Sequence, residues 1–213
     1  MRRPILYDYH RSSAAYRVRI ALNLKSVDYE SRPVNLLESE QRGDDYRELN
    51  PQGLVPMLEI DGHRLTQTLA IIVYLDQCFP DPPLVPRDPA DGAHVRAMAL
   101  AVACDIHPLN NLRVLKYLKA QLGRSQEEVD VWYAHWISEG LGALEAMAKA
   151  GAGEFLFGDS LTIADVCLVP QLFNARRYNV PLDAYPTLLR ADESANALDA
   201  FAAAHPDRQK VPA

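Results

Sequence analysis

The chain has 213 residues, of which 48% are hydrophobic and 23% charged, and its formal net charge is −6 at pH 7. This length and composition suit an ordinary soluble globular protein with one large domain or two modest ones. The negative net charge excludes a global attraction to nucleic acid or anionic lipid, so any anionic ligand needs a local basic cluster. We find no apolar run long enough for an export signal or a membrane span, and expect neither nucleic acid nor a membrane as partner.

The three cysteines, Cys78, Cys104 and Cys167, are widely spaced and lie within apolar helical patterns. Their odd number and spacing match neither a disulfide framework nor a metal-binding motif. We therefore expect a protein of the reducing cytoplasm that holds no metal ion.

Residues 1–79 alternate between strand-like and helix-like patterns. Strands are indicated at 4–9, 28–36, 55–62 and 63–66, and helices at 15–24 and 67–79. The last two strands are separated by Asp61 and Gly62, a dipeptide that favours a tight hairpin. A strand, helix and strand followed by a hairpin and a helix predict a small α/β domain.

The segment PDPPLVPRDP marks a domain boundary. It has five prolines in ten residues, which exclude regular structure and indicate a stiff linker over residues 80–90. From residue 91 to 213 helical patterns dominate, so we expect an all-helical second domain. Helices are indicated at 91–121 with a kink at Pro108, at 125–150, at 162–175 and at 195–205.

A helix start is clearly indicated in the sequence LTIAD. Thr162 is placed to cap the helix, and Asp165 follows three residues later, as in a capping box. We expect this motif to serve folding rather than chemistry.

Three short motifs in the first domain have both a structural and a functional interpretation. Ser12 and Ser13 precede a helix and would normally cap it, but a serine hydroxyl at a helix N-terminus can also stabilise a thiolate. Thr68 is expected to cap its helix, whose N-terminus could in addition hold a carboxylate. The spacing alone favours a trans Val55–Pro56 bond, whereas a cis bond would leave the Val55 backbone free to pair with an extended peptide.

Polar residues in the second domain are less specific. His107, Asn111 and Arg113 lie in the first long helical pattern, and Arg176 with Arg177 ends a later one. Cations favour a helix C-terminus without any further role. Taken singly, each of these residues has a structural explanation.

Several motifs, taken together and in order, resemble the zeta class of the glutathione transferase superfamily across almost the whole chain. They are RSSAAYRVRIAL, NPQGLVPMLEIDG, QTLAIIVYL, CDIHPLNNLRVLKYL and LTIADVCLVPQ. The resemblance implies a thioredoxin-like N-terminal domain that binds glutathione, an all-helical C-terminal domain that closes the acceptor-substrate site, and a homodimer.

The zeta class includes glutathione-dependent isomerases of maleylacetoacetate and maleylpyruvate, so the resemblance implies this activity. Glutathione thiolate would add to the cis double bond, the bond would rotate, and elimination would release the fumaryl isomer. One alternative is a general zeta-class transferase acting on α-haloacids or other small electrophiles. Another is a binding protein of the same fold without catalysis.

The resemblance also implies roles for particular residues. Ser12 and Ser13 would face the sulfur. Glutathione would further be held by Gln41, Val55 beside a cis Pro56, Gln67, Thr68, His107 and Asn111. For the dicarboxylate, the candidates are Arg11, Arg113 and Arg177, because a guanidinium matches a carboxylate bidentately and stays charged at any relevant pH, and Arg11 is counted among the catalytic residues. Ala14 stands where the class usually has cysteine, so reductive dehalogenation through such a cysteine is not expected.

Overall fold

A computed structural model describes residues 3–209 and 211, and within it the chain divides into two compact units. The first comprises the described residues of Met1–Pro83 and Leu198–Ala213, and the second is Leu84–Ala197. The expected helical domain over 91–213 includes the C-terminal residues, whereas the structure groups them with the first unit. The reason is that helix α9 (Asp199–Ala204) packs along helix α1 (Ser13–Leu24).

The first unit contains a four-stranded mixed sheet. Its strands are β1 (Ile5–Asp8), β2 (Glu30–Pro33), β3 (Met57–Ile60) and β4 (His63–Thr66), in the order β2-β1-β3-β4. Strand β1 runs parallel to β2 and antiparallel to β3, and β3 and β4 form a hairpin. Asp61 and Gly62 have positive φ angles of 50° and 80°, as a two-residue hairpin turn requires. The predicted α/β domain and its hairpin are confirmed.

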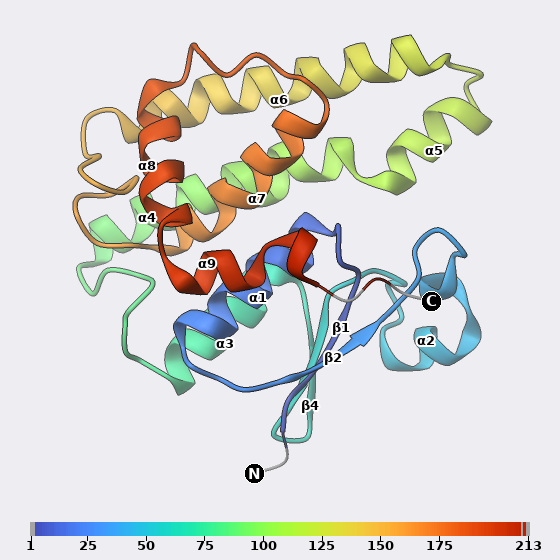
Figure 1. Ribbon diagram of the computed structural model, residues 1–213, viewed down its shortest axis with the longest axis horizontal. Coiled ribbons are helices and arrows are strands. Elements are labelled where there is room, and N and C mark those ends of the chain that lie inside the picture. The colour runs from blue at the N-terminus through green and yellow to red at the C-terminus, as the bar shows by residue number, and fades with distance from the viewer. Residues whose placement is uncertain (1–2, 210, 212–213) are drawn as a thin grey trace. The chain divides into compact units, whose positions relative to one another are not determined.

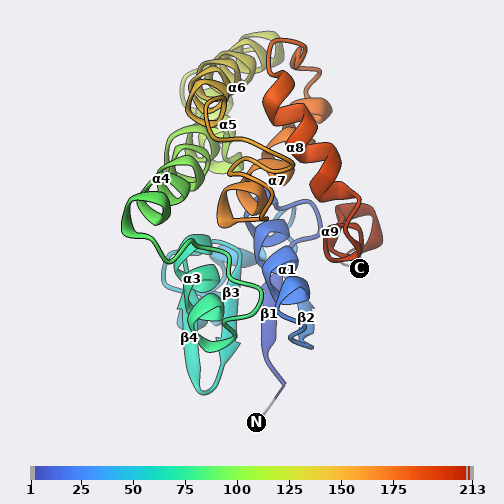
Figure 2. The ribbon, with the colours of Figure 1, turned by 90° about the vertical axis from the view of Figure 1, so that its left-hand side faces the viewer.

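Helices α1 and α3 (Thr68–Cys78) lie side by side on one face of this sheet (Figures 1 and 2), and α2 (Asp44–Leu49) lies on the other face (Figure 1). A 3-10 turn over Glu40–Arg42 precedes α2, and another over Pro206–Arg208 follows α9. Leu6, Val18, Leu58 and Ile71 are fully buried between the sheet and the helices. This packing holds the N-terminal ends of α1 and α3 in place.

The second unit is helical. Its α-helices are α4 (Pro89–Leu100), α5 (Leu112–Ala120), α6 (Gln126–Ala148), α7 (Ile163–Arg177) and α8 (Pro186–Asn196). The helix expected over 195–205 is wrong in its bounds. The chain forms α8, extends at Leu198 (φ −82°, ψ 134°) and then begins α9. Among the described residues no helix has both the length and the apolar character that crossing a membrane requires.

The helix expected over 91–121 is interrupted rather than only kinked. After α4 the chain forms a π-helical segment, Ala101–Ile106, and a 3-10 turn, His107–Asn110, before α5 begins. Pro108 lies in the 3-10 turn, where its missing N–H prevents a regular helix from continuing. A Cβ on Gly140 of α6 would lie only 2.1 Å from Cγ1 of Ile106. The glycine therefore lets α6 approach the end of the π-helical segment at Ile106.

The predicted capping box at the start of α7 is confirmed. The Thr162 hydroxyl oxygen accepts from the Ala164 N–H, and the Asp165 carboxylate accepts from the Thr162 N–H at 2.8 Å. Asp165 also accepts from the Thr162 hydroxyl at 2.9 Å and from the Leu156 N–H at 2.8 Å. Burial raises the pKa of Asp165, and these hydrogen bonds oppose that shift. The motif thus fastens the preceding loop to α7.

Candidate functional site

The N-terminus of α1 carries the two serines. The Ser12 N–H donates to the Tyr9 carbonyl at 2.8 Å, and the Ser12 hydroxyl oxygen accepts from the Ala15 N–H at 3.2 Å. Ser12 is therefore the cap, as predicted, and its hydroxyl hydrogen is left to donate to another group. Ser12 is half-buried, Ser13 is buried as the first residue of the helix, and Arg11 is exposed.

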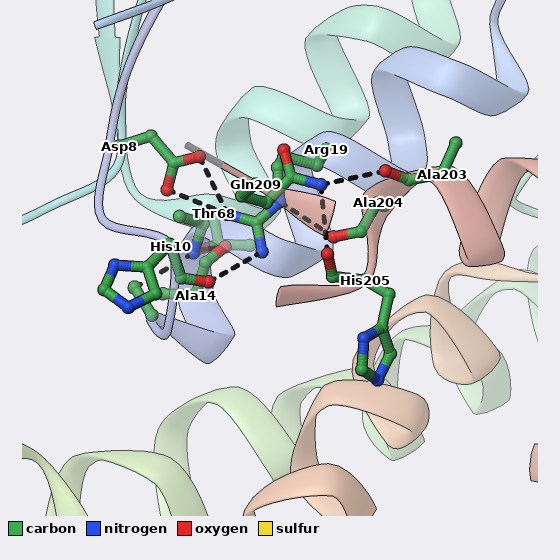
Figure 3. A network of polar contacts seen from close by, with 11 residues as sticks. Asp8, His10, Ala14, Arg19, Thr68, Ala203, Ala204, His205 and Gln209 are labelled. Atoms are coloured by element: carbon green, nitrogen blue, oxygen red, sulfur yellow. Dashed lines mark hydrogen bonds and ion pairs between the residues drawn. The ribbon is translucent and has the colours of Figure 1, made fainter. Parts of the chain in front are cut away.

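The N-terminus of α3 lies next to that of α1. The hydroxyl of Thr68 donates to the Ala14 carbonyl at 3.4 Å, which links the first turns of the two helices (Figure 3). The expectation that Thr68 caps α3 is wrong, because Gln67 occupies the cap position and its side chain makes no capping bond. Gln67 has a positive φ of 67°, a conformation that is rare outside glycine and is concentrated at functional sites.

The loop before β3 presents the backbone of Val55. The Leu54 carbonyl accepts two hydrogen bonds of 2.7 Å, one from the Tyr46 hydroxyl and one from the Asn50 side chain. The Val55–Pro56 bond is cis, as the resemblance implies and contrary to the trans bond that the spacing alone favours. Within the described chain no group hydrogen-bonds to the Val55 backbone. Its N–H and carbonyl are therefore available to an extended ligand.

Gln41 lies against Gly53, which belongs to the loop that leads to Val55. It is 9% exposed, and its Oε1 has no hydrogen-bond partner among the described residues. Gly53 lies against it with φ +60°, and a Cβ there would lie 2.8 Å from the Gln41 carbonyl oxygen. Gln52, next to Gly53, accepts a 3.0 Å hydrogen bond from the Gln67 amide. The sequence did not predict the Gly53 contact or the Gln52 bond, although the glycine in NPQG was a signal for the first.

In the second unit, α6 holds the segment that contains His107 and Asn111. The Trp132 Nε1 donates to the Leu109 carbonyl at 2.9 Å, and the Asn110 amide donates to the Tyr133 carbonyl at 3.4 Å. Asn111 then caps α5, and its Oδ1 accepts from the Arg113 N–H at 3.1 Å. The Arg113 side chain is exposed.

The C-terminal end of α7 meets the same part of α6. The Tyr178 ring stacks on Tyr133 with 3.7 Å between centroids and 18° between planes. The exposed Arg177 lies 5.9 Å from the Tyr178 ring and 5.9 Å from the Phe173 ring. Arg176 differs, because it pairs with Asp192 at 2.6 Å. Arg177 forms no ion pair with any residue that the structure describes, and its Nη1 donates only a long hydrogen bond of 3.5 Å to the Asn174 side chain.

The structure brings the expected site residues together in two groups, one in each unit. The first unit holds Arg11, Ser12, Ser13, Gln41, Val55, Pro56, Gln67 and Thr68. The second unit holds His107, Asn111, Arg113 and Arg177. Because the first group combines two adjacent helix N-termini, a hydroxyl donor and a free strand-like backbone, it can bind an anionic peptide and lower the pKa of a thiol.

Known proteins with similar sequences and structures give a consistent picture. Models of the N-terminal and C-terminal domains of glutathione S-transferases match residues 6–83 and 130–203. A probable maleylacetoacetate isomerase of Vibrio cholerae is 50% identical over 208 residues, which are 96% of each chain.

Two solved structures match closely as well. A holo maleyl pyruvate isomerase, described as a bacterial zeta-class glutathione S-transferase, has a TM-score of 0.95 and 43% identity over 98% of this chain and 100% of that one. A maleylacetoacetate isomerase of Anaeromyxobacter dehalogenans, holding dicarboxyethyl glutathione and citrate in its active site, has a TM-score of 0.87. It is 43% identical over 99% of this chain and 98% of that one.

Proposed function

The chain belongs to the zeta class of the glutathione S-transferase family, and we propose that it is a glutathione-dependent cis–trans isomerase acting on maleylacetoacetate or maleylpyruvate. The observation that carries this proposal is the meeting of the α1 and α3 N-termini, with the Ser12 hydroxyl at one of them. The positive ends of two helix dipoles favour negatively charged ligand groups, and a hydroxyl donor stabilises a thiolate. Together they favour a ligand that carries a thiolate and a carboxylate.

Glutathione fits the residues of the first unit. The Val55 backbone can pair with the cysteinyl backbone, and the α3 N-terminus with Gln67 and Thr68 can hold the γ-glutamyl carboxylate and amine. The buried Oε1 of Gln41 has no partner among the described residues, and such an acceptor is expected to meet a donor. The N–H of the glycyl end of glutathione is a donor of the required kind. His107 and Asn111 of the second unit are assigned to glutathione through the family resemblance.

The residues of the first unit also explain how the thiol is activated. Glutathione, when bound, supplies the thiolate that adds to the cis double bond and leaves after rotation. The Ser12 hydroxyl would donate a hydrogen bond to that sulfur, and the α1 N-terminus would add positive potential, so both would lower the pKa of the thiol. Ser12 is preferred over Ser13 because Ser13 is buried in the first turn.

Arginines are proposed to hold the dicarboxylate and to stabilise negative charge that develops on its carbonyl. A guanidinium binds a carboxylate through two parallel N–H groups and stays charged at every relevant pH. Arg11, Arg113 and Arg177 are all exposed, so each is accessible to a ligand. Stabilisation of developing charge by fixed cations is a major contribution to catalysis of this type.

Incubation with maleylpyruvate and with maleylacetoacetate, each with and without glutathione, tests the proposed function. We expect the ultraviolet spectrum to change to that of the fumaryl isomer only when glutathione is present, while total glutathione stays constant. Net consumption of glutathione with an α-haloacid, and no isomerisation of either maleyl substrate, would instead favour a general transferase.

Replacement of Arg177 by alanine tests the substrate assignment. We expect the KM for the dicarboxylate to rise by about tenfold, the size of one lost charge-assisted contact, while glutathione affinity stays nearly unchanged. Arg176→Ala is the matched control, because Arg176 is committed to Asp192 and should affect stability without changing this KM. Equal losses of affinity for both ligands in Arg177→Ala would contradict the assignment.

The proposal extends to the location and assembly of the protein. Cys78, Cys104 and Cys167 are free thiols in the structure, which suits the reducing cytoplasm. The homodimer is proposed from the family resemblance, and sedimentation equilibrium over a range of protein concentrations tests it.

A further inference from the structure

A single buried guanidinium, that of Arg19, connects three parts of the first unit. We propose that Arg19 is a positioning residue, which holds the turn carrying Ser12 and the C-terminal helix α9 in the arrangement that activates the glutathione thiol. The inference rests on the proposed function, because it assigns Arg19 a role through Ser12.

The contacts of Arg19 reach in three directions (Figure 3). Its Nη1 donates to both carboxylate oxygens of Asp8, at 2.9 and 2.8 Å. Its Nη2 donates to the His10 carbonyl at 3.2 Å, and its Nε donates to the Ala204 carbonyl at 2.9 Å. The Arg19 side chain is fully buried, and that of Asp8 is 3% exposed. Each nitrogen of the guanidinium, Nε, Nη1 and Nη2, therefore has a hydrogen-bond acceptor within the first unit.

Two of these partners adjoin the proposed nucleophile-activating turn. Asp8 is the last residue of β1, and His10 lies two residues before Ser12. The turn is closed by the bond from the Ser12 N–H to the Tyr9 carbonyl. Since Tyr9 lies between Asp8 and His10, fixing both of these neighbours also fixes the acceptor that orients Ser12.

The third partner joins the far end of the sequence to this turn. Ala204 is the last residue of α9, where helix carbonyls have no partner within the helix. Arg19 supplies a donor to the Ala204 carbonyl, and Gln209 donates to the Ala203 and His205 carbonyls at 2.8 and 3.0 Å. Asn23, one helical turn after Arg19, donates to the Ala200 carbonyl at 2.9 Å. Arg19 and Asn23 of α1 thus both donate to carbonyls of α9, and Arg19 also donates to the His10 carbonyl in the turn.

The need for arginine, rather than for any buried cation, makes the proposal testable. A lysine ammonium can pair with Asp8 as a point charge, but it cannot extend a planar fork to the His10 and Ala204 carbonyls at the same time. Arg19→Lys thus keeps the charge pair and removes the positioning contacts.

The decisive measurement is the pKa of the thiol of bound glutathione, followed by the ultraviolet absorbance of the thiolate. In Arg19→Lys we expect this pKa to rise by about one unit, which lowers the thiolate fraction about tenfold at a pH below it. The rate kcat should fall in proportion at neutral pH and recover at higher pH, while KM for glutathione stays nearly constant. Asn23→Ala, the matched control, loosens α9 without touching the turn and should leave the thiol pKa unchanged.

A second variant separates positioning from folding. The double replacement Asp8→Leu with Arg19→Met exchanges the buried pair for apolar residues, a change that proteins often tolerate without loss of stability. It should fold cooperatively and still show the raised thiol pKa. If either folded variant keeps the wild-type thiol pKa and pH–rate profile, Arg19 has no positioning role. The titration needs no acceptor substrate, so failure of isomerisation in the wild-type protein would refute the proposed function separately.

Discussion

Replacing Ser12 with alanine should raise the pKa of the bound glutathione thiol by about one to two units, the equivalent of one hydrogen bond to a charged group. Turnover at neutral pH should then fall by about tenfold to a hundredfold, because only the thiolate adds to the double bond. The same absorbance titration of the thiolate measures the first effect, and steady-state kinetics measure the second.

Ser13→Ala is the matched control for this prediction. Ser13 is buried within the first turn of α1, whereas Ser12 is half-buried at the cap with its hydroxyl hydrogen left to donate. Ser12→Ala also removes a helix cap, which costs about 1 kcal/mol of stability, so thermal unfolding of both variants should accompany the kinetics. A raised thiol pKa in Ser13→Ala, with none in Ser12→Ala, would reverse the assignment.

Replacing Asp165 with alanine should lower the free energy of unfolding of the second unit by about 4 kcal/mol, because three donors lose a buried, charged acceptor. Those donors are the Leu156 N–H, the Thr162 N–H and the Thr162 hydroxyl. Alanine cannot accept from any of them, and water cannot easily replace the carboxylate at a position with 0% exposure. Thermal unfolding followed by circular dichroism should show a drop in Tm of roughly 10 °C.

Asp159→Ala provides the comparison for this effect. Asp159 also accepts a backbone hydrogen bond, from the Glu154 N–H at 2.9 Å, but it is exposed. Water can satisfy that N–H, so the loss of stability should stay below about 1 kcal/mol. Similar losses in the two variants would show that burial does not determine the strength of the capping box.

Local patterns in the sequence predicted the features that depend on neighbouring residues. The Asp61–Gly62 hairpin, the Ser12 cap and the box of Thr162 with Asp165 all formed as expected. The proline-rich segment follows α3, but α4 begins at Pro89, inside the stretch 80–90 that was expected to lack regular structure. Caps and turns are predictable because dihedral preferences and capping bonds act within a few residues.

The prediction for Thr68 failed because its partner is distant in the sequence. A hydroxyl at the start of a helix ordinarily caps it, but here the hydroxyl bonds to Ala14, 54 residues away, and Gln67 takes the cap position with a positive φ. Periodicity also could not show that the 91–121 segment passes through a π-helix or that α9 leaves the helical unit. These outcomes depend on packing against elements that a local pattern does not contain.

By itself, the sequence determined the α/β and helical character of the two parts of this protein, its main caps and turns, and the family resemblance that pointed to glutathione. The tertiary structure decided which N-termini adjoin and that Arg19 joins Asp8, His10 and Ala204, and it contains the cis Val55–Pro56 bond that the resemblance implied but the local spacing did not. The physical reason is that caps and turns are formed by bonds between near neighbours. The buried arginine, in contrast, is stable only where strand, turn and C-terminal helix together supply its acceptors.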